Sequence, residues 1–347
     1  MSDQKVFDEI LDNALQVFRL AANQRSITLA NLKKLEKELL AKFIVEDLTA
    51  RQKAKLETFI KRTDKLIEKH FKSLQKELDL EGIAEVASFA TVHAYEIAFG
   101  FEALNLPTKD YFKSVASNVL IEGSPAADWW RGQSEDLKFR FAGQVRQGLT
   151  NGENNQQIIS RIIGKNGYPG IMETARRNAA ALVQTSVQAV ANDARRATFD
   201  ANPDVIKGLR QVSTLDGRTS LTCVAYSNAA WDLNRKPILG TTLPFNGGCP
   251  RHFNCRSVEI PITKTFRELG LDMDEPTGTT RASADGQINV NTSFEDFLDR
   301  RGKAYQDQVL GKGRADLYRQ GKITLRDLIY ADGRPVSLEE LKRKYAK

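Results

Sequence analysis

Apolar side chains recur every three or four positions through the first hundred residues, which is the spacing of one face of an α-helix. Three stretches show this pattern, at 6–22, 31–44 and 56–78, and a more apolar, alanine-rich stretch follows at 81–104. Lysines lie between the apolar positions of the third stretch, as on the solvent side of an amphipathic helix. We therefore predict a long helical arm or coiled-coil-like helices over residues 1–105.

A second helical block is predicted over residues 106–203, after the break that Pro107 introduces. Helices are expected at 137–149 and 155–163, separated by a turn rich in asparagine and glycine, and a long alanine-rich helix is expected at 174–202. Small side chains along that last helix suit close packing against other helices. This block therefore leads directly into the region where the pattern changes.

Beyond residue 203 the helical period gives way to strand signals and turns. Residues 209–220 alternate like a strand and contain Asp216 followed by glycine, a tight-turn signal, and residues 257–262 resemble a short closing strand. Glycine and proline are frequent between them. We predict a small β-containing, loop-rich module over residues 204–262, so the expected fold class is mainly α with this module, α+β overall.

The segment 263–347 is expected to be a linker followed by short C-terminal helices. Residues 272–292 are polar with few large apolar side chains, a composition typical of a linker or mobile loop. Two or three short amphipathic helices follow. Ser293 and Ser337 suit the N-cap position of two of them, because Asp or Glu follows each serine shortly afterwards.

Positive charge is concentrated in one part of the chain. The formal net charge is +7, and between Lys33 and Glu77 there are 13 Lys and Arg against 8 Asp and Glu. Positive surfaces attract polyanions, nucleic acid above all, although a solvated helix face with mixed charges would also explain the surplus. The best candidates for phosphate contact are Lys53, Lys55, Lys61, Arg62, Lys65, Lys69 and Lys72.

Neither a membrane span nor a secretory signal is predicted. No apolar run of about 20 residues exists, and the most apolar stretch, around 83–101, is interrupted by Glu85, His93 and Glu96. The first 18 residues are acidic and amphipathic, without a basic start or a small-residue cleavage site. We expect a soluble protein in a reducing cytosol, with no membrane partner.

All three cysteines fall within 33 residues, at Cys223, Cys249 and Cys255, and His252 lies among them. An odd number of cysteines in a reducing compartment does not indicate a disulfide framework. The spacing C-x25-C-x2-H-x2-C supplies three thiols and one imidazole, a ligand set common in structural zinc sites. We therefore expect these four residues as metal ligands, with zinc stabilising a module that has little core of its own.

Two other interpretations of these residues stay open. In the first, Cys223 and Cys255 are buried small hydrophobes and Cys249 is incidental. In the second, His252 activates Cys223 or Cys255 as a nucleophile. The cytidine-deaminase pattern does not fit, because it needs Glu soon after the first ligand and then P-C-x-x-C. No catalytic residues are assigned.

A structural clamp is expected between the Asp216 turn and the loop that carries His252. Arg218 or Arg256 is within reach of Asp216 in such an arrangement and would form a two-pronged ion pair with its carboxylate. The same arginines would serve phosphate binding in the functional alternative. We favour the structural role.

Two separated strings resemble the phage head morphogenesis family, the minor head proteins similar to protein F of phage Mu. The strings are T-L-D-G-R-T-S-x-x-C at 214–223 and P-x-H-x-x-C-R-S at 250–257, with a closing strand after them. An alanine-rich helix like that of the family precedes them, matched by Thr185, Ala189, Asn192, Ala194 and Arg195. Cys223, His252 and Cys255 fall at recurrent positions of the family, and the resemblance covers about residues 120–262.

The resemblance implies a minor capsid protein of a tailed phage, not an enzyme. Such a protein would associate with the portal protein and with capsid or scaffold proteins during assembly, and would contact double-stranded DNA secondarily. Its expected location is the virion, in the head interior or at the portal vertex, after synthesis in the host cytoplasm. The alternative is a metal- or cysteine-dependent hydrolase or nuclease that uses the Cys/His cluster.

Overall fold

The computed structural model describes residues 3–46, 53–99, 104–165, 167–214, 216–265, 267–270, 272, 280–283, 286–289, 293–330 and 334–345. Helices dominate and small antiparallel sheets complete the fold, so the predicted mainly α class with a small β module is confirmed. The chain forms two compact units. Unit 1 comprises Met1–Val17, Glu81–Val115 and Gln188–Lys347, and unit 2 comprises Phe18–Leu80 and Ala116–Val187.

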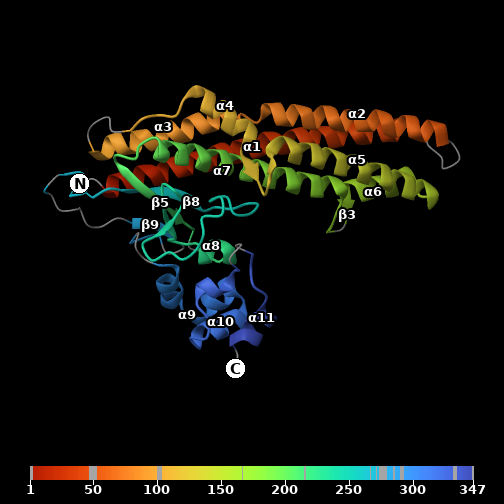
Figure 1. Cartoon of the computed structure of the whole chain (residues 1–347). Coiled ribbons are helices and arrows are strands. Elements are labelled where there is room, and N and C mark those ends of the chain that lie inside the picture. Colours follow the sequence, from red (N-terminus) through yellow and green to blue (C-terminus); the bar gives the residue numbers. More distant parts are fainter. Residues whose placement is uncertain are drawn as a thin grey trace. The chain divides into compact units, whose positions relative to one another are not determined.

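Unit 2 is a bundle of helices that run side by side (Figure 1). Its helices are α1 (Asp3–Val45, from Phe18 onward), α2 (Lys53–Glu77), α5 (Ala126–Thr150), α6 (Asn155–Ile163) and α7 (Ile171–Asp200, up to Val187). Unit 2 also contains two short strand pairs: β1 (Leu120–Ile121) with β2 (Ser124–Pro125), and β3 (Gly164–Lys165) with β4 (Tyr168–Pro169). The two stretches predicted at 6–22 and 31–44 belong to one continuous helix, because residues 23–30 contain no glycine or proline.

Aromatic side chains hold the core of unit 2 together. The ring of Phe59 on α2 lies 6.0 Å from that of Phe43 on α1 and 6.4 Å from that of Phe141 on α5. Further along α2, the Phe71 ring meets Trp130 edge-on at 6.2 Å. Burial of each such ring stabilises the fold by roughly 1.5–3 kcal/mol. The apolar stripe read from the sequence of α2 therefore faces the bundle.

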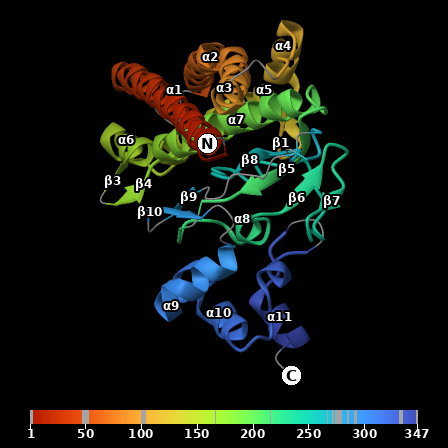
Figure 2. The ribbon, with the colours of Figure 1, turned by 90° about the vertical axis from the view of Figure 1, so that its left-hand side faces the viewer.

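Unit 1 contains a four-stranded antiparallel sheet in the order β7-β6-β5-β8 (Figure 2). The strands are β5 (Ile206–Val212), β6 (Ala230–Asp232), β7 (Pro237–Ile238) and β8 (Val258–Thr263), and the helices α3 (Leu80–Phe99) and α4 (Lys109–Asn118) belong largely to the same unit. Trp231 on β6 is fully buried, stacks on Tyr226 and lies against Phe199 and Leu209 in one apolar cluster. Strands β5 and β8 pair antiparallel, so the strands predicted within 209–220 and 257–262 are neighbours in the small β module.

A two-stranded hairpin occupies part of the segment predicted as a linker. Strands β9 (Thr280–Ser283) and β10 (Gly286–Asn289) pair antiparallel, so the linker prediction for 272–292 is wrong for these residues. Pairing of strands depends on backbone hydrogen bonds, which a polar sequence such as TRAS does not reveal. The rest of the predicted linker, apart from Asp272, lies outside the described residues.

The C-terminal helices form a lobe with its own apolar core. They are α9 (Phe294–Leu310), α10 (Lys312–Arg319), the 3₁₀ turn η1 (Leu325–Leu328) and α11 (Leu338–Tyr345). The Ser293 side chain caps α9 in a reciprocal box with Asp296, and the Ser337 hydroxyl accepts a hydrogen bond from the Glu340 N–H, so both predicted caps are confirmed. Among the helices described, none is both long and apolar enough to cross a membrane.

Candidate metal centre and basic helix face

The short helix α8 (Leu221–Ala225) delivers the first of the candidate ligands. Ser220 caps this helix, because its side chain accepts a hydrogen bond from the Cys223 N–H at 3.2 Å. The cap fixes the orientation of the first turn. Cys223 therefore leaves α8 with its side chain buried and directed at the loop that carries the other ligands.

The loop before β8 supplies the remaining two ligands. The Cys255 N–H donates to the His252 carbonyl at 3.1 Å, which closes a tight turn and brings the two side chains together. The ligand atoms of Cys223, His252 and Cys255 all lie within 4.8 Å of one another. Residues separated by about thirty positions in the sequence thus form one cluster, which we call the thiol–imidazole cluster.

Distances within the thiol–imidazole cluster match those around a tetrahedral ion. The Cys223 Sγ lies 3.5 Å from the Cys255 Sγ and 3.2 Å from the His252 Nε2. With Zn–S bonds of about 2.3 Å and Zn–N bonds of about 2.0 Å, tetrahedral geometry places two sulfurs roughly 3.8 Å apart and a sulfur and a nitrogen roughly 3.5 Å apart. In each of these two pairs the atoms would need to separate by only about 0.3 Å to reach that geometry.

The hydrogen bonds of His252 determine which nitrogen faces the thiols. Its Nδ1 lies 2.8 Å from the carbonyl oxygen of Phe253, and a carbonyl oxygen only accepts hydrogen bonds. The proton of the neutral ring is therefore on Nδ1, and the lone pair is on Nε2. Nε2 accepts from the Ser220 hydroxyl at 2.7 Å and points toward Cys223. A backbone partner on the second nitrogen is usual for metal-binding histidines.

Cys249 lies beside the thiol–imidazole cluster and outside its three-residue group. Its thiol forms a hydrogen bond with Cys255, while burial raises its pKa well above the ordinary value. Cys255 accepts hydrogen bonds from the thiols of Cys223 and Cys249, and these bonds lower the pKa of Cys255. Cys255 is therefore the central thiol, and Cys249 is the nearest further sulfur.

The predicted clamp exists, and Arg256 makes it. Its guanidinium donates to both carboxylate oxygens of Asp216, at 2.6 and 2.5 Å. Arg218 contributes its backbone N–H, which donates to Asp216 Oδ1 at 2.9 Å, while its side chain is exposed. Of the two arginines expected as alternatives, Arg256 therefore makes the ion pair, and Arg218 contributes through its backbone alone.

A buried ion pair that the sequence analysis missed ties the module to α7. Glu259 on β8 is 1% exposed, and its carboxylate accepts from Arg196 of α7 at 2.8 Å and from the Cys249 N–H at 2.6 Å. Asn192, also on α7, accepts from the Glu259 N–H at 3.4 Å. A carboxylate within an otherwise apolar strand, SVEIPI, was the signal for this contact.

Gly248 permits the close approach of the Glu259 carboxylate. Its φ is +77°, and a Cβ at this position would lie 2.2 Å from Glu259 Oε1. Any other residue would therefore be strained in its backbone and would collide with the buried pair. The glycine-rich start of the loop is thus required by the contact between the loop and β8.

Arg251 is a second residue of this loop to which the sequence analysis gave no role. Its guanidinium stacks over the Tyr226 ring, 3.5 Å from the centroid, and donates to Gln211 Oε1 at 2.6 Å and to the Phe245 carbonyl at 3.1 Å. A cation over an aromatic face is attracted by the ring quadrupole. Arg251 therefore fastens the loop to Gln211 of β5 and to the Tyr226 ring.

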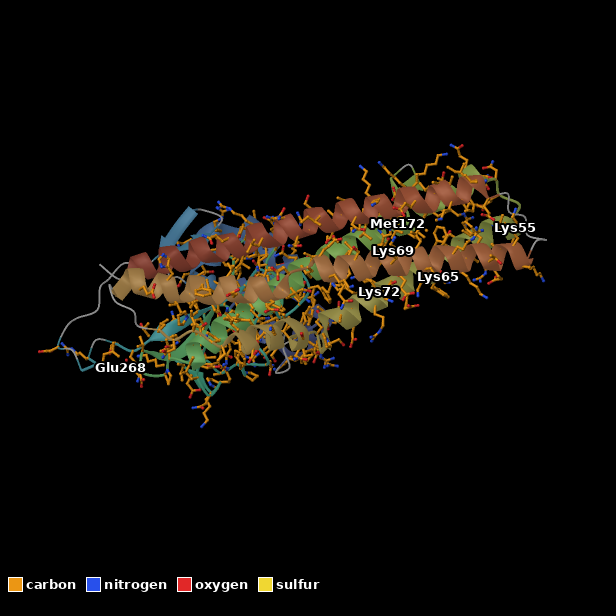
Figure 3. The ribbon with its side chains drawn as sticks, turned by 90° about the horizontal axis from the view of Figure 1, so that it is seen from above. Lys55, Lys65, Lys69, Lys72, Met172 and Glu268 are labelled. Carbon is orange, nitrogen blue, oxygen red and sulfur yellow. The ribbon has the colours of Figure 1, made fainter. Side chains whose placement is uncertain are left out.

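Basic side chains form a stripe on the exposed face of α2 in unit 2. Successive steps of four, four, three and four residues place Lys61, Lys65, Lys69, Lys72 and Lys76 on one side of the helix, and Figure 3 marks three of them along α2. We call this set the α2 lysine stripe. It lies opposite the buried residues Phe59, Thr63 and Ile67.

The other predicted phosphate contacts lie elsewhere on α2. Arg62 is engaged by Glu46, whose two carboxylate oxygens each accept at 2.9 Å. Lys53 and Lys55 are exposed near the start of the helix and fall off the α2 lysine stripe. Within the stripe, Lys72 pairs with Glu68 at 2.5 Å. The α2 lysine stripe therefore contains four of the seven predicted cations, together with Lys76, which was not predicted.

No family model, curated protein or solved structure matches the chain.

Proposed function

We propose that this protein is a minor capsid protein of a tailed phage that associates with the portal protein and with capsid or scaffold proteins during head assembly. One observation carries the proposal. The two strings that resemble the head morphogenesis family are joined by the Asp216–Arg256 clamp and by the thiol–imidazole cluster. The two strings thus contact each other in one part of unit 1, which supports the proposal.

Contacts of α7 support the same proposal. The matching helix residues Asn192 and Arg195 lie on the part of α7 that belongs to unit 1, and the Asn192 side chain accepts from the backbone of β8. The neighbouring Arg196 pairs with Glu259. The helix that precedes the strings in the sequence is therefore attached to the strand that follows them.

Zinc is the metal that we propose for the thiol–imidazole cluster. Cys223, His252 and Cys255 would hold the ion, with Cys249 as the nearest sulfur for the fourth position. Two of the three ligands are thiols and the third is an imidazole, the donor set that favours zinc over magnesium or calcium. Bound zinc would cross-link α8 to the loop before β8 and so stabilise the module.

Contact with double-stranded DNA is the secondary part of the proposal, through the α2 lysine stripe. Five lysines on one helix face, about 22 Å from Lys61 to Lys76 at 1.5 Å per residue, would follow a phosphate backbone and release its counterions. We place the protein in the virion, in the head interior or at the portal vertex, after synthesis in the host cytoplasm.

Co-purification with a portal ring tests the proposal. Tagged portal protein from the phage that encodes the chain would be co-expressed with the wild type and with an Asp216→Asn/Arg256→Gln variant. We expect the wild type to elute with the ring on size exclusion and the variant to lose most of that association while keeping its helical circular dichroism. A wild type that never elutes with the portal ring contradicts the proposal.

A hydrolase or nuclease is the second candidate function, and one contact favours it. The Cys223 Sγ lies 3.2 Å from the His252 Nε2, within the range of a nucleophile and its base. The test is cleavage of double-stranded DNA by the purified protein, beside Cys223→Ser and His252→Ala variants. Cleavage that these variants abolish without unfolding would favour the enzyme. If the variants lose both the bound zinc and the folded structure, the structural centre would be favoured.

A further inference from the structure

A groove of about 490 Å³ lies between α1 and α7 within unit 2, on residues to which the proposed function assigns no role. The two helices run antiparallel beside each other (Figure 1). We call this hollow the α1–α7 groove. Its lining residues are Arg25, Leu29, Ala30, Lys33, Glu173, Arg176, Arg177 and Ala180.

The lining combines an apolar strip with positive charge. Leu29, Ala30 and Ala180 supply the apolar surface, and two of these three are alanines, which allow another backbone to approach closely. Four cations against Glu173 give the lining a net charge of +3. Charge and apolar surface together fit a ligand that has both an apolar and an acidic side.

Three of the cations have no carboxylate of their own. Arg176 is engaged by Glu36, whereas Arg25, Lys33 and Arg177 form no ion pair with any residue that the structure describes. Six arginines of unit 2 do have acidic partners, namely Arg62, Arg131, Arg140, Arg146, Arg161 and Arg176. Two of the three described arginines of unit 2 that form no ion pair with another described residue, Arg25 and Arg177, therefore lie beside the apolar strip, where an acidic partner would neutralise them.

The length of the groove indicates the shape of the partner. From Arg25 to Lys33 the α1 wall spans eight residues, or about 12 Å, and from Glu173 to Ala180 the α7 wall spans seven, or about 10.5 Å. This is about two turns of a third helix laid along the pair. A single small anion would not reach both Arg25 and Lys33.

We propose that the α1–α7 groove docks an acidic amphipathic helix of a partner protein. Its apolar face packs on Leu29, Ala30 and Ala180, and its flanking carboxylates pair with Arg25, Lys33 and Arg177. The apolar strip and the Glu173 carboxylate disfavour a nucleic-acid backbone, which offers phosphates along its whole length. This inference is independent of the proposed capsid function and of the α2 lysine stripe.

Binding of a designed peptide tests the inference. The probe is a fluorescein-labelled helical peptide of 18 residues with leucine on one face and glutamate on both flanks, titrated with the full chain by fluorescence anisotropy. We expect Arg25→Glu/Arg177→Glu to weaken binding at least about tenfold, since both charges would repel the flanks. Ala180→Trp should weaken it comparably, because the indole fills the apolar strip without a change of charge.

Two controls distinguish the groove from general attraction to a basic protein. Lys65→Glu/Lys69→Glu makes the same charge change on the α2 lysine stripe and should alter binding by less than about threefold. A peptide of the same composition with its leucines dispersed should bind at least about tenfold more weakly than the amphipathic one. Circular dichroism checks that every variant folds.

Three outcomes would overturn the inference. Equal binding by the wild type, the groove reversal and Ala180→Trp would place the peptide elsewhere. Equal binding of the dispersed peptide would mean that charge alone is recognised. A 20-base-pair DNA duplex that binds the wild type and loses affinity on Arg25→Glu/Arg177→Glu, while the peptide does not bind, would assign the groove to a phosphate backbone.

Discussion

Arg256 grips both carboxylate oxygens of Asp216, at 2.6 and 2.5 Å, and so joins two turns that lie 40 residues apart in the chain. Two parallel hydrogen bonds to one carboxylate fix the relative orientation of the partners as well as their distance. The side chains are 29% and 21% exposed, so solvent screens the pair only in part. The pair is therefore a structural clamp of moderate strength.

Replacement of Asp216 by Asn should destabilise the protein in a pH-dependent way. The hydrogen bonds from Arg256 lower the pKa of Asp216 to about 2, against about 3.9 in an unfolded chain. A lowered pKa stabilises the fold above the unfolded value and loses that effect as the pH falls through the folded value. We expect Asp216→Asn to cost about 1–2 kcal/mol at pH 7 and to approach the wild type near pH 2. Urea unfolding between pH 7 and pH 2 measures both.

Arg218→Gln is the matched control for that series. It removes an arginine of the same turn whose side chain is exposed, and it leaves the backbone hydrogen bond to Asp216 intact. Its cost should stay below about 0.5 kcal/mol at every pH. If Arg218→Gln costs as much as Arg256→Gln, the clamp has been assigned to the wrong arginine.

Loss of the Glu259 carboxylate should be far more damaging than loss of Asp216. Glu259→Leu would leave the buried Arg196 with Asp193 as its one carboxylate partner among the described residues and would unpair the Cys249 N–H, so we expect a loss of about 3–5 kcal/mol. The double variant Arg196→Met/Glu259→Leu should cost less than the sum of the single changes, because no unpaired charge remains. A double-mutant cycle by urea unfolding measures the coupling, and strictly additive costs would show that the two side chains do not depend on each other.

Metal analysis of the purified protein should find about one zinc ion per chain. Cys255→Ala and His252→Ala should abolish zinc retention and lower the melting temperature, as a chelator should in the wild type. Cys249→Ala should weaken retention less, because Cys249 lies outside the three-ligand group. A wild type that takes up no zinc on refolding with excess metal, and that a chelator leaves unchanged, would contradict the zinc assignment.

Neutralisation of the α2 lysine stripe should weaken DNA binding uniformly across sequences. The triple change Lys65→Gln, Lys69→Gln and Lys72→Gln removes three phosphate contacts and should reduce the salt slope of log K by about 2.7. Lys53→Gln, off the stripe, should have less effect than Lys65→Gln alone. Gel-shift titrations of one duplex at several salt concentrations measure these slopes, and equal effects of the two single changes would remove the stripe from the proposal.

The helices and the chemistry of the loop are the parts that sequence reasoning can reach. Apolar spacing predicts the buried face of α2 because an amphipathic helix repeats its pattern every turn. The turn at Asp216 and the loop at Arg256 belong to one small module and carry opposite charges, so an ion pair between them could be predicted. The signal for α2 lies within one helix. The signal for the clamp comes from two short strings, around Asp216 and Arg256, that are each unusual in composition.

Other parts depend on contacts that no local pattern reveals. Spacing alone could not separate Cys249 from the three grouped ligands, since the backbone of Cys249 is bound by Glu259 and Arg196, which lie outside the loop. The groove residues Arg25 and Arg177 lie about 150 residues apart, and the sequences of the two helices do not reveal that the helices are neighbours. Glu259 resembled an ordinary strand residue until its partner on α7 was visible.

The five-residue helix α8 contributes residues both to the thiol–imidazole cluster and to the core of the C-terminal lobe. Cys223 faces the thiol–imidazole cluster, while the next residue, Val224, is buried in the apolar core of the C-terminal lobe, with Leu221 packed against the same core. A helix this short has no flexible segment to absorb a rotation between adjacent positions. Oxidation or metal exchange at the sulfurs would therefore be transmitted to the packing of α9 and η1, which makes the terminal lobe a reporter of the chemical state of the thiols.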